Sequence, residues 1–303
     1  EEKIRQLAEK KKTNFSKAFE SALKDIRGAY AFAVIYKQEP SNLYLARLGS
    51  PLVVGVGGDA ASAKASASQG EYFLASDPAA LAGMAKKVIY LTDGQRGKLT
   101  LEGFAIGPAK PRLEKLDLTP EQAQKGQFPH FMLKEIFEIP EVVRAALRGR
   151  LLPQKNLVKL GGLEMIYPKL KRIKRMEIIA CGTSYYAGLV GELLFEELCH
   201  WPVETGIDSE WRYRKNPLPR NTACLFISQS GETADTLAAL RKAASHKLLT
   251  LGLVNVVGSA IARETKAGVY ARAGAEIGVA STKAFLSQLT NLVLMALQLA
   301  PNK

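Results

Sequence analysis

The feature that most constrains the fold is residues 228–236, with the sequence SQSGETADT. The apolar run 222–227 before it is typical of a buried strand, and the good helix formers of 237–243 follow it. Four of its nine side chains are hydroxyls, and Gly231 relaxes the backbone between them. Such a turn can aim hydroxyls and backbone N–H groups at an anion over the positive end of a helix dipole. A helix N-cap with spare hydroxyls is the alternative.

The same arrangement occurs a second time upstream. The apolar run 176–181 predicts a strand, residues 182–184 predict a turn, and 185–198 predict a helix. A third stretch, 276–285, again leads into a helix through small residues and hydroxyls. Loops at the carboxyl ends of neighbouring parallel strands face one crevice, where ligands bind. Two such loops favour a site for a phosphorylated small molecule over a pair of accidental caps.

Strands and helices alternate from residue 173 onward. This alternation predicts a three-layer α/β domain with a doubly wound parallel sheet. Its expected strands are 176–181, 203–207, 223–228, 248–254 and 268–271, and its last helix is 281–299.

Short strands and close turns before residue 101 predict a different, mostly antiparallel unit. We expect strands at 28–35, 43–47, 51–56, 72–76 and 88–91, a closing hairpin over 94–101, helices at 3–12, 15–26 and 77–85, and a surface loop at 60–70. Residues 108–127 predict a linker, and Pro140 is expected to divide two helices at 130–139 and 140–150.

Charge, cysteine content and the length of apolar runs argue against a nucleic-acid-binding protein, a secreted disulfide-linked protein and a membrane-spanning one. The formal net charge is +13, and its richest basic stretch, 144–175, holds one tyrosine and no other aromatic residue. A solvated face is therefore favoured over a nucleic-acid site. The three cysteines are odd in number and lack metal-ligand spacing, which favours buried thiols in a cytoplasmic protein. No apolar run reaches the ~18 residues that a membrane-spanning helix needs; the last helix comes nearest, but polar residues interrupt it.

Five motifs carry a family resemblance. Residues 181–184, 228–236 and 276–285, with 130–136 and 210–215, closely resemble the first sugar-isomerase (SIS) domain of glucosamine-6-phosphate synthases, also called glutamine–fructose-6-phosphate aminotransferases (isomerising). The resemblance implies a partial chain in three parts. They are the end of an α+β, Ntn-type glutamine amidotransferase domain at 1–115, a linker with its helices at 116–150, and the first SIS domain at 151–303.

The resemblance also implies the site residues and their ligand, fructose 6-phosphate or glucosamine 6-phosphate. The phosphate would be held by Ser184, Ser228, Gln229, Ser230 and Thr233, and the sugar contacted by Thr183, Val279 and Ser281. Glu232 is expected to serve the geometry of its loop, and Asp235 the start of the helix. No metal or other cofactor is implied, and the SIS domains of this family pair as homodimers.

Neither catalytic centre of the family is expected in this segment. The family's glutaminase nucleophile is an N-terminal cysteine, whereas no cysteine precedes Cys181 here. Its isomerising groups belong to a second SIS domain and a C-terminal tail, and Lys283 is expected to be structural. The expected function is thus the sugar-phosphate-binding part of the enzyme that makes glucosamine 6-phosphate and glutamate from fructose 6-phosphate and glutamine. A non-catalytic regulator with a single SIS domain is the alternative, and the amidotransferase-like first half argues against it.

Overall fold

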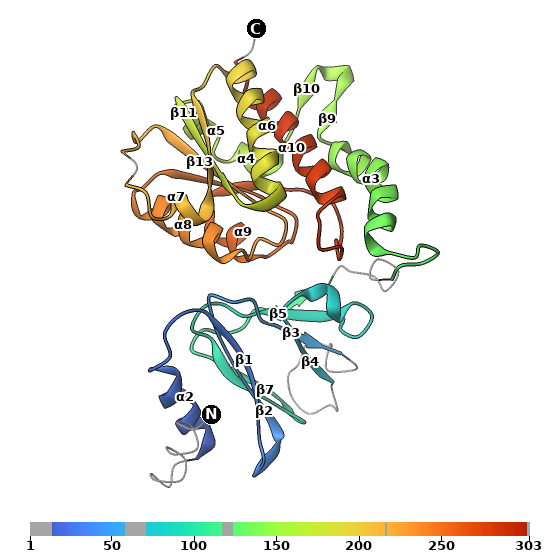
Figure 1. The fold of residues 1–303 in the computed structure, drawn as a ribbon, viewed down its shortest axis with the longest axis vertical. Coiled ribbons are helices and arrows are strands. Elements are labelled where there is room, and N and C mark those ends of the chain that lie inside the picture. The colour runs from blue at the N-terminus through green and yellow to red at the C-terminus, as the bar shows by residue number, and fades with distance from the viewer. Residues whose placement is uncertain (1–13, 58–70, 117–123, 216, 302–303) are drawn as a thin grey trace. The chain divides into compact units, whose positions relative to one another are not determined.

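The computed structural model describes residues 14–57, 71–116, 124–215 and 217–301. The chain divides into two compact units, residues 1–123 and 124–303 (Figure 1). The predicted helix at 3–12 and the predicted loop at 60–70 lie outside the described residues.

The first unit consists of two four-stranded antiparallel sheets. One has the order β1-β2-β6-β7 and the other β4-β3-β5-β8. The strands are β1 (Tyr30–Tyr36), β2 (Glu39–Leu48), β3 (Val53–Val56), β4 (Tyr72–Ala75), β5 (Lys87–Tyr90), β6 (Arg96–Thr100), β7 (Gly103–Gly107) and β8 (Glu114–Lys115). The predicted antiparallel character is confirmed among these residues. Strand β8 was not predicted, because a strand of two residues is too short to show an alternation of apolar and polar side chains.

One helix covers the first sheet of this unit. Helix α2 (Phe15–Leu23) buries Phe15, Phe19 and Leu23, which recur at helical spacing, and they pack on Tyr44 of β2. Asn14 starts the helix, because its side chain accepts a hydrogen bond from the backbone N–H of Lys17 at 3.1 Å. The helix expected at 77–85 is only a 3₁₀ turn, η2 (Pro78–Leu81).

The second unit contains the predicted parallel sheet. Its strand order is β12-β11-β13-β14-β15, and every neighbouring pair is parallel. The strands are β11 (Arg175–Ala180), β12 (Val203–Ile207), β13 (Thr222–Ser228), β14 (Leu249–Val254) and β15 (Ala267–Tyr270). The chain runs from β11 outward to β12, then returns past β11 to β13. The doubly wound sheet is thereby confirmed.

Helices cover both faces of this sheet (Figure 1). Alternate side chains of each central strand enter different cores: Ile178 and Leu225 belong to one, and Ile179 and Phe226 to the other. The first core lies under α6 (Gly182–Cys199) and α10 (Lys283–Leu299), and the second lies under α7 (Asp208–Trp211), α8 (Ala234–Ser245) and α9 (Ala260–Glu264). This is the expected three-layer architecture.

The elements that precede this sheet in the second unit follow in chain order. They are α3 (Phe131–Leu147), β9 (Leu151–Leu152), η3 (Pro153–Lys155), β10 (Leu157–Val158), α4 (Gly161–Glu164) and α5 (Tyr167–Leu170). The expected break at Pro140 is wrong, because α3 runs through it as one helix. Val142 of this helix packs against Ala273 and Ala284. Tertiary packing of this kind, together with the helical φ of proline, outweighs the missing N–H.

Two further expectations need correction. The predicted turn 182–184 is already the first turn of α6, although Gly182 has a φ of 57°. Arg150 does not belong to a solvated face, because its side chain is buried. It donates hydrogen bonds to Asn291 Oδ1 at 2.6 Å and to the Tyr270 carbonyl at 2.8 Å. The basic stretch therefore includes a structural arginine.

Candidate functional site

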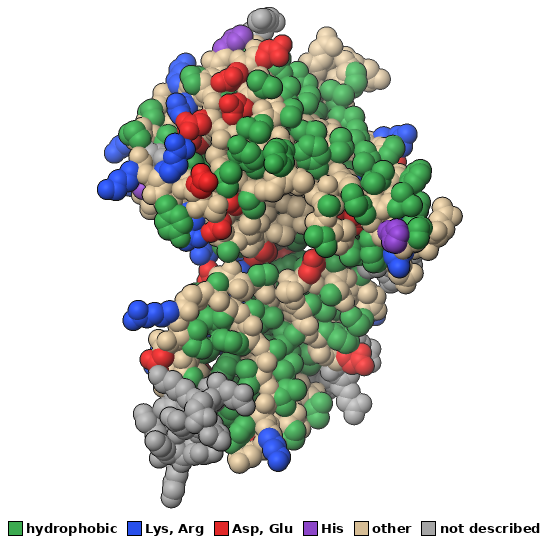
Figure 2. Space-filling view, in the orientation of Figure 1, with side chains coloured by type: hydrophobic (Ala, Val, Ile, Leu, Met, Phe, Trp, Pro, Cys, Tyr) green, Lys and Arg blue, Asp and Glu red, His purple; other side chains and the backbone are tan. Residues whose placement is uncertain are grey.

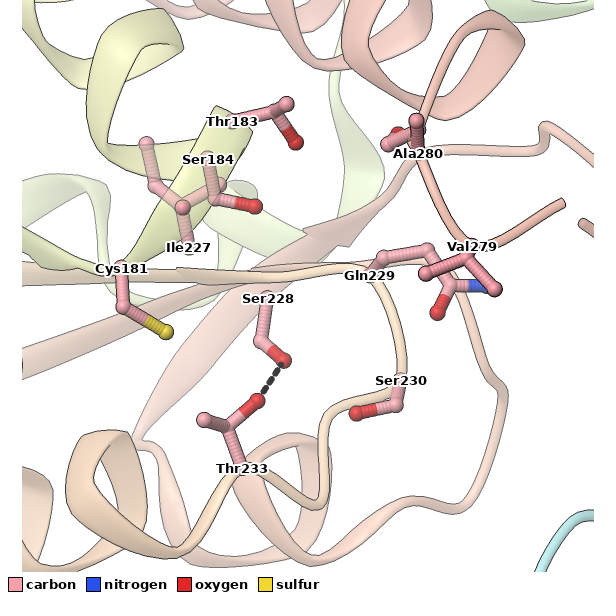
Figure 3. Close-up of a pocket in the computed structure, with 12 residues that line it drawn as sticks. Cys181, Thr183, Ser184, Ile227, Ser228, Gln229, Ser230, Thr233, Val279 and Ala280 are labelled. Atoms are coloured by element: carbon pink, nitrogen blue, oxygen red, sulfur yellow. Dashed lines mark hydrogen bonds between the residues drawn. The ribbon is translucent and has the colours of Figure 1, made fainter.

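A pocket opens where the winding of the parallel sheet reverses. Strands β11 and β13 are neighbours, yet their chains leave in opposite directions across the sheet. In sheets of this class the crevice at the carboxyl ends of two such strands is where ligands bind. Here the ends of β11 and β13 border a cavity of about 360 Å³ (Figure 3).

All eight site residues predicted from the sequence line this cavity. The lining residues are Cys181, Gly182, Thr183, Ser184, Ile227, Ser228, Gln229, Ser230, Thr233, Val279, Ala280 and Ser281. Cys181, Gly182, Ile227 and Ala280 were not predicted. Each lies within two residues of a predicted one, and Cys181 and Gly182 belong to the motif 181–184, so the signal was available. The contact of each residue with a ligand stays a prediction.

The hydroxyl of Ser184 is oriented by a buried amide. Gln288 of α10 donates from Nε2 to Ser184 Oγ at 2.9 Å, and both side chains are buried. Because the serine oxygen accepts this bond, its own proton is available to an acceptor in the cavity. Gln288 was missed from the sequence because it lies 104 residues beyond its partner.

The loop after β13 presents its hydroxyls in the same way. The backbone N–H of Glu232 donates to Ser230 Oγ at 3.2 Å, and that of Gly231 donates to Ser228 Oγ at 2.9 Å. Ser228 Oγ and Thr233 Oγ1 lie 2.9 Å apart, the contact dashed in Figure 3. Only one of these two hydroxyls can donate to the other, so one proton of the pair remains for a ligand. The site is therefore a set of hydrogen-bond donors.

Two helix ends supply positive partial charge to the site. The twelve lining residues include no Lys, Arg or His, and no Asp or Glu. Cys181 is the N-cap of α6 and Thr233 is the N-cap of α8, so the positive ends of both helix dipoles face the cavity. Helix N-termini with free N–H groups bind anions. The arrangement is suited to hold a phosphate through hydrogen bonds without a salt bridge.

Gly231 allows the loop after β13 to pack closely on α9. Its φ is 66°, and a Cβ built there would lie 2.0 Å from Ser259 Oγ. The Gly231 carbonyl accepts from the Ile261 N–H at 3.0 Å, and the Glu232 carboxylate accepts from the Ala260 N–H at 2.8 Å. Glu232 thus holds the loop to the start of α9, as expected. Asp235, in the first turn of α8, also forms an ion pair with Arg212.

The loop of residues 276–282, which leads into α10, is held by the carboxylate of Glu276. Glu276 accepts hydrogen bonds from Ser281 Oγ at 2.8 Å and from the backbone N–H groups of Thr282 and Ala284 at 2.8 and 3.0 Å. Lys283 is buried, and its Nζ lies 2.6 Å from Glu138 Oε2. This contact agrees with the structural role expected for Lys283.

The expectation of three buried thiols is wrong for Cys181. Its side chain is half-buried and faces the cavity, whereas Cys199 and Cys224 are buried. Burial, and then the neighbouring Asp208 carboxylate, raise the pKa of the Cys181 thiol to about 11. Burial likewise raises the pKa of Cys199 to about 12 and that of Cys224 still further. The thiol in the cavity is therefore neutral and a poor nucleophile near pH 7.

Two other findings concern the described residues alone. Among them, no helix is both long and apolar enough to cross a membrane. Nor do three or more His, Cys, Asp or Glu side chains of the described ranges gather where they could hold a metal ion.

Comparison with known proteins gives matches to both units. Residues 169–298 match the family model described as the SIS domain. A glutamine–fructose-6-phosphate aminotransferase (isomerizing) of Chlorobaculum tepidum is 44% identical over 291 residues, which is 94% of this chain and 46% of that protein. The protein of the same name from Bacteroides thetaiotaomicron is 44% identical over 292 residues, with the same two coverages. The chain thus spans about half the length of these relatives.

A solved structure agrees with the fold of the second unit. The C-terminal domain of glucosamine-fructose-6-phosphate aminotransferase from Francisella tularensis superposes with a TM-score of 0.55 and 38% sequence identity. The match covers 58% of this chain and 49% of that one. The second unit therefore contains an SIS domain, and nearly the whole chain is similar to about half the length of proteins named glutamine–fructose-6-phosphate aminotransferase.

Proposed function

We propose that this chain binds fructose 6-phosphate or glucosamine 6-phosphate in the cavity between β11 and β13. Ser184, Ser228, Gln229, Ser230 and Thr233 hold the phosphate, and Thr183, Val279 and Ser281 contact the sugar. The observation that carries the proposal is the orientation of the hydroxyls. Ser184 and Ser230 each accept a hydrogen bond from the protein, which leaves their protons for an acceptor in the cavity. A phosphate dianion is a strong acceptor of this kind.

Calorimetry with the full chain tests this proposal. Fructose 6-phosphate should bind at least about tenfold more tightly than fructose, because hydrogen bonds to charged groups contribute about 1.5–3 kcal/mol each. Fructose 1-phosphate is a matched control of the same charge with the phosphate at the other end. Equal affinity for fructose and fructose 6-phosphate would refute the assignment of the phosphate subsite.

We further propose that the chain is part of an enzyme that converts fructose 6-phosphate and glutamine to glucosamine 6-phosphate and glutamate. The similarity to proteins of that name over 94% of the chain supports this assignment. None of the twelve residues lining the cavity is a Lys, His, Asp or Glu, so this pocket offers no side chain suited to shift a proton between sugar carbons. The pocket holds the substrate, and the reacting groups come from elsewhere in the enzyme.

The first unit is proposed to be the end of an Ntn-type glutamine amidotransferase domain, at residues 1–115. Residues 116–150 are proposed as the linker with its helices, and 151–303 as the first SIS domain. The two antiparallel sheets of the first unit support an α+β assignment. The alternative, a single-SIS regulator that binds sugar phosphate without catalysis, has no use for such a unit. Sugar amination by a protein that contains this chain would exclude the regulator.

We propose that two copies pair through their SIS domains. Apolar side chains remain exposed along three helices of the second unit, and Figure 2 shows hydrophobic atoms gathered over this region. They are Met132, Leu133, Ile136 and Phe137 of α3, Tyr186, Leu189, Val190 and Leu193 of α6, and Val293 and Leu297 of α10. A patch of this kind marks an interaction surface. Sedimentation should give a dimer mass, and Leu193→Glu should give a monomer; a monomeric wild-type chain would refute the pairing.

We also propose that the protein acts in the cytoplasm, without binding nucleic acid or a membrane. Its three cysteines are free thiols, which favours a reducing compartment. Retention on immobilised DNA or RNA at physiological salt would contradict the nucleic-acid part of this proposal.

A further inference from the structure

Val279 belongs to the loop of residues 276–281, which is proposed to contact the sugar, and only the backbone of this loop fixes its position. Val279 lines the cavity, yet its side chain is fully exposed (105%). Figure 3 places Val279 and Ala280 across the cavity from Thr183 and Ser184. Because a fully exposed side chain is not held by packing, the placement of Val279 depends on how the backbone of residues 276–281 is anchored.

The anchor is a buried carboxylate from a distant part of the chain. Glu135 of α3 is only 2% exposed. Its Oε1 accepts hydrogen bonds from the backbone N–H groups of Ile277 and Gly278, at 2.6 and 3.1 Å, and its Oε2 lies 3.3 Å from the same Gly278 nitrogen. These bonds join residues 142 and 143 positions apart. The two amides immediately before Val279 are thus tied to α3.

The fit between Glu135 and the loop requires glycine. A Cβ added at Gly278 would lie 2.6 Å from Glu135 Oε2 and 3.5 Å from the Met132 Cα. Any larger residue would therefore displace either the carboxylate or the loop. On the far side of Val279, Glu276 binds Ser281 Oγ and the Thr282 N–H. The backbone on both sides of Val279 is held by carboxylates, of which only Glu135 lies outside the loop's own segment.

We infer that Glu135 is a positioning residue for the sugar subsite, presetting residues 277–279 in the conformation that contacts the sugar. This inference rests on the proposed function of the cavity and extends it to a residue that does not line it. The hydrogen bonds that Glu135 accepts among the described residues come from Ile277 and Gly278, and not from the loop of residues 228–233 or the start of α6. Its loss should therefore weaken contacts to the sugar and leave the phosphate subsite intact. A binding loop that is fixed before the ligand arrives loses less entropy on binding.

Two variants and two ligands test the inference in the full chain. Glu135→Gln keeps the length of the side chain but removes its charge and places an N–H₂ group among backbone N–H donors. Glu141→Gln is the matched control, because it removes an exposed carboxylate from the same helix. Binding of fructose 6-phosphate is measured by calorimetry, and binding of inorganic phosphate by NMR titration. Hydrogen exchange of the Ile277 and Gly278 amides is measured in the free proteins.

The inference predicts that Glu135→Gln weakens binding of the sugar phosphate but not binding of inorganic phosphate. Glu135→Gln should weaken fructose 6-phosphate binding by about tenfold, equivalent to one charge-assisted hydrogen bond, and leave phosphate binding unchanged. The two amides should exchange faster in this variant, and Glu141→Gln should match the wild type throughout. Unchanged sugar-phosphate affinity would overturn the inference, and so would an equal loss for both ligands, since that would indicate a general structural defect.

The outcome for the wild type separates this inference from the proposed function. If the wild-type chain binds neither ligand, the proposed function fails. The exchange rates then still decide whether Glu135 anchors the loop, because they are measured without ligand. Unchanged exchange in Glu135→Gln would overturn the anchoring in that case too.

Discussion

Replacing Ser230 by alanine is a direct test of the phosphate subsite. Ser230 is partly exposed, and its Oγ accepts one rather long bond, 3.2 Å from the Glu232 nitrogen. The folded protein therefore loses little when this hydroxyl is removed, because Glu232 N–H can bond to water. A bound phosphate loses one charge-assisted hydrogen bond, which is about 1.5–3 kcal/mol. That range corresponds to binding weaker by about tenfold to a hundredfold.

The assay is calorimetric titration with fructose 6-phosphate, with Ser245→Ala as the control. The Ser245 hydroxyl bonds to the Lys242 carbonyl at the far end of α8, away from the cavity. In a complete enzyme the same change should raise KM and leave kcat nearly unchanged, because the phosphate does not react and is held alike in the ground and transition states. A normal affinity in Ser230→Ala would refute the reasoning, and so would a folded variant whose kcat is abolished at saturating sugar phosphate.

Further predictions concern the scaffold. Gly231→Ala should lower the free energy of unfolding, measured in urea, by more than Gly182→Ala does. Both residues have positive φ, which disfavours alanine by ~1–2 kcal/mol, but only at Gly231 would the new Cβ meet Ser259. Equal losses in the two variants would contradict the close contact. Arg150→Met should destabilise by about 1–3 kcal/mol through unpaired buried acceptors, while exposed Arg148→Met should not. Alkylation of Cys181 should remain slow at pH 8 and accelerate towards pH 11, since the thiolate is the nucleophile; rapid labelling at pH 7 would contradict the raised pKa.

The sheet and the cavity could be predicted because their signals are local. Each strand–loop–helix unit carries its own apolar run and its own hydroxyl-rich turn, as in 222–236. Parallel pairing then brings the carboxyl ends of β11 and β13 together without further information. Six of the eight predicted residues come from these two strand–loop–helix units, and the family resemblance supplied their expected roles. Val279 and Ser281 come from 276–285, a segment that no strand leads into directly and that bonds distant in the chain hold in place.

Other features depend on contacts that no local pattern records. The break expected at Pro140 ignored the packing of Val142 on Ala273 and Ala284. The exposed face expected for Arg150 ignored Asn291, which lies 141 residues away. Glu135 belongs to a motif that the family resemblance marked, but its bonds to the loop at 277–278 appear only in the folded chain.

A crystal structure of the chain with fructose 6-phosphate would test the central claim most directly. We expect the phosphate to lie at the loop of residues 228–233, within hydrogen-bond distance of the hydroxyls of Ser230 and of Ser184, with the sugar extending towards Val279. A phosphate bound at another place on the second unit, with the cavity between β11 and β13 holding only water at saturating ligand, would contradict the account.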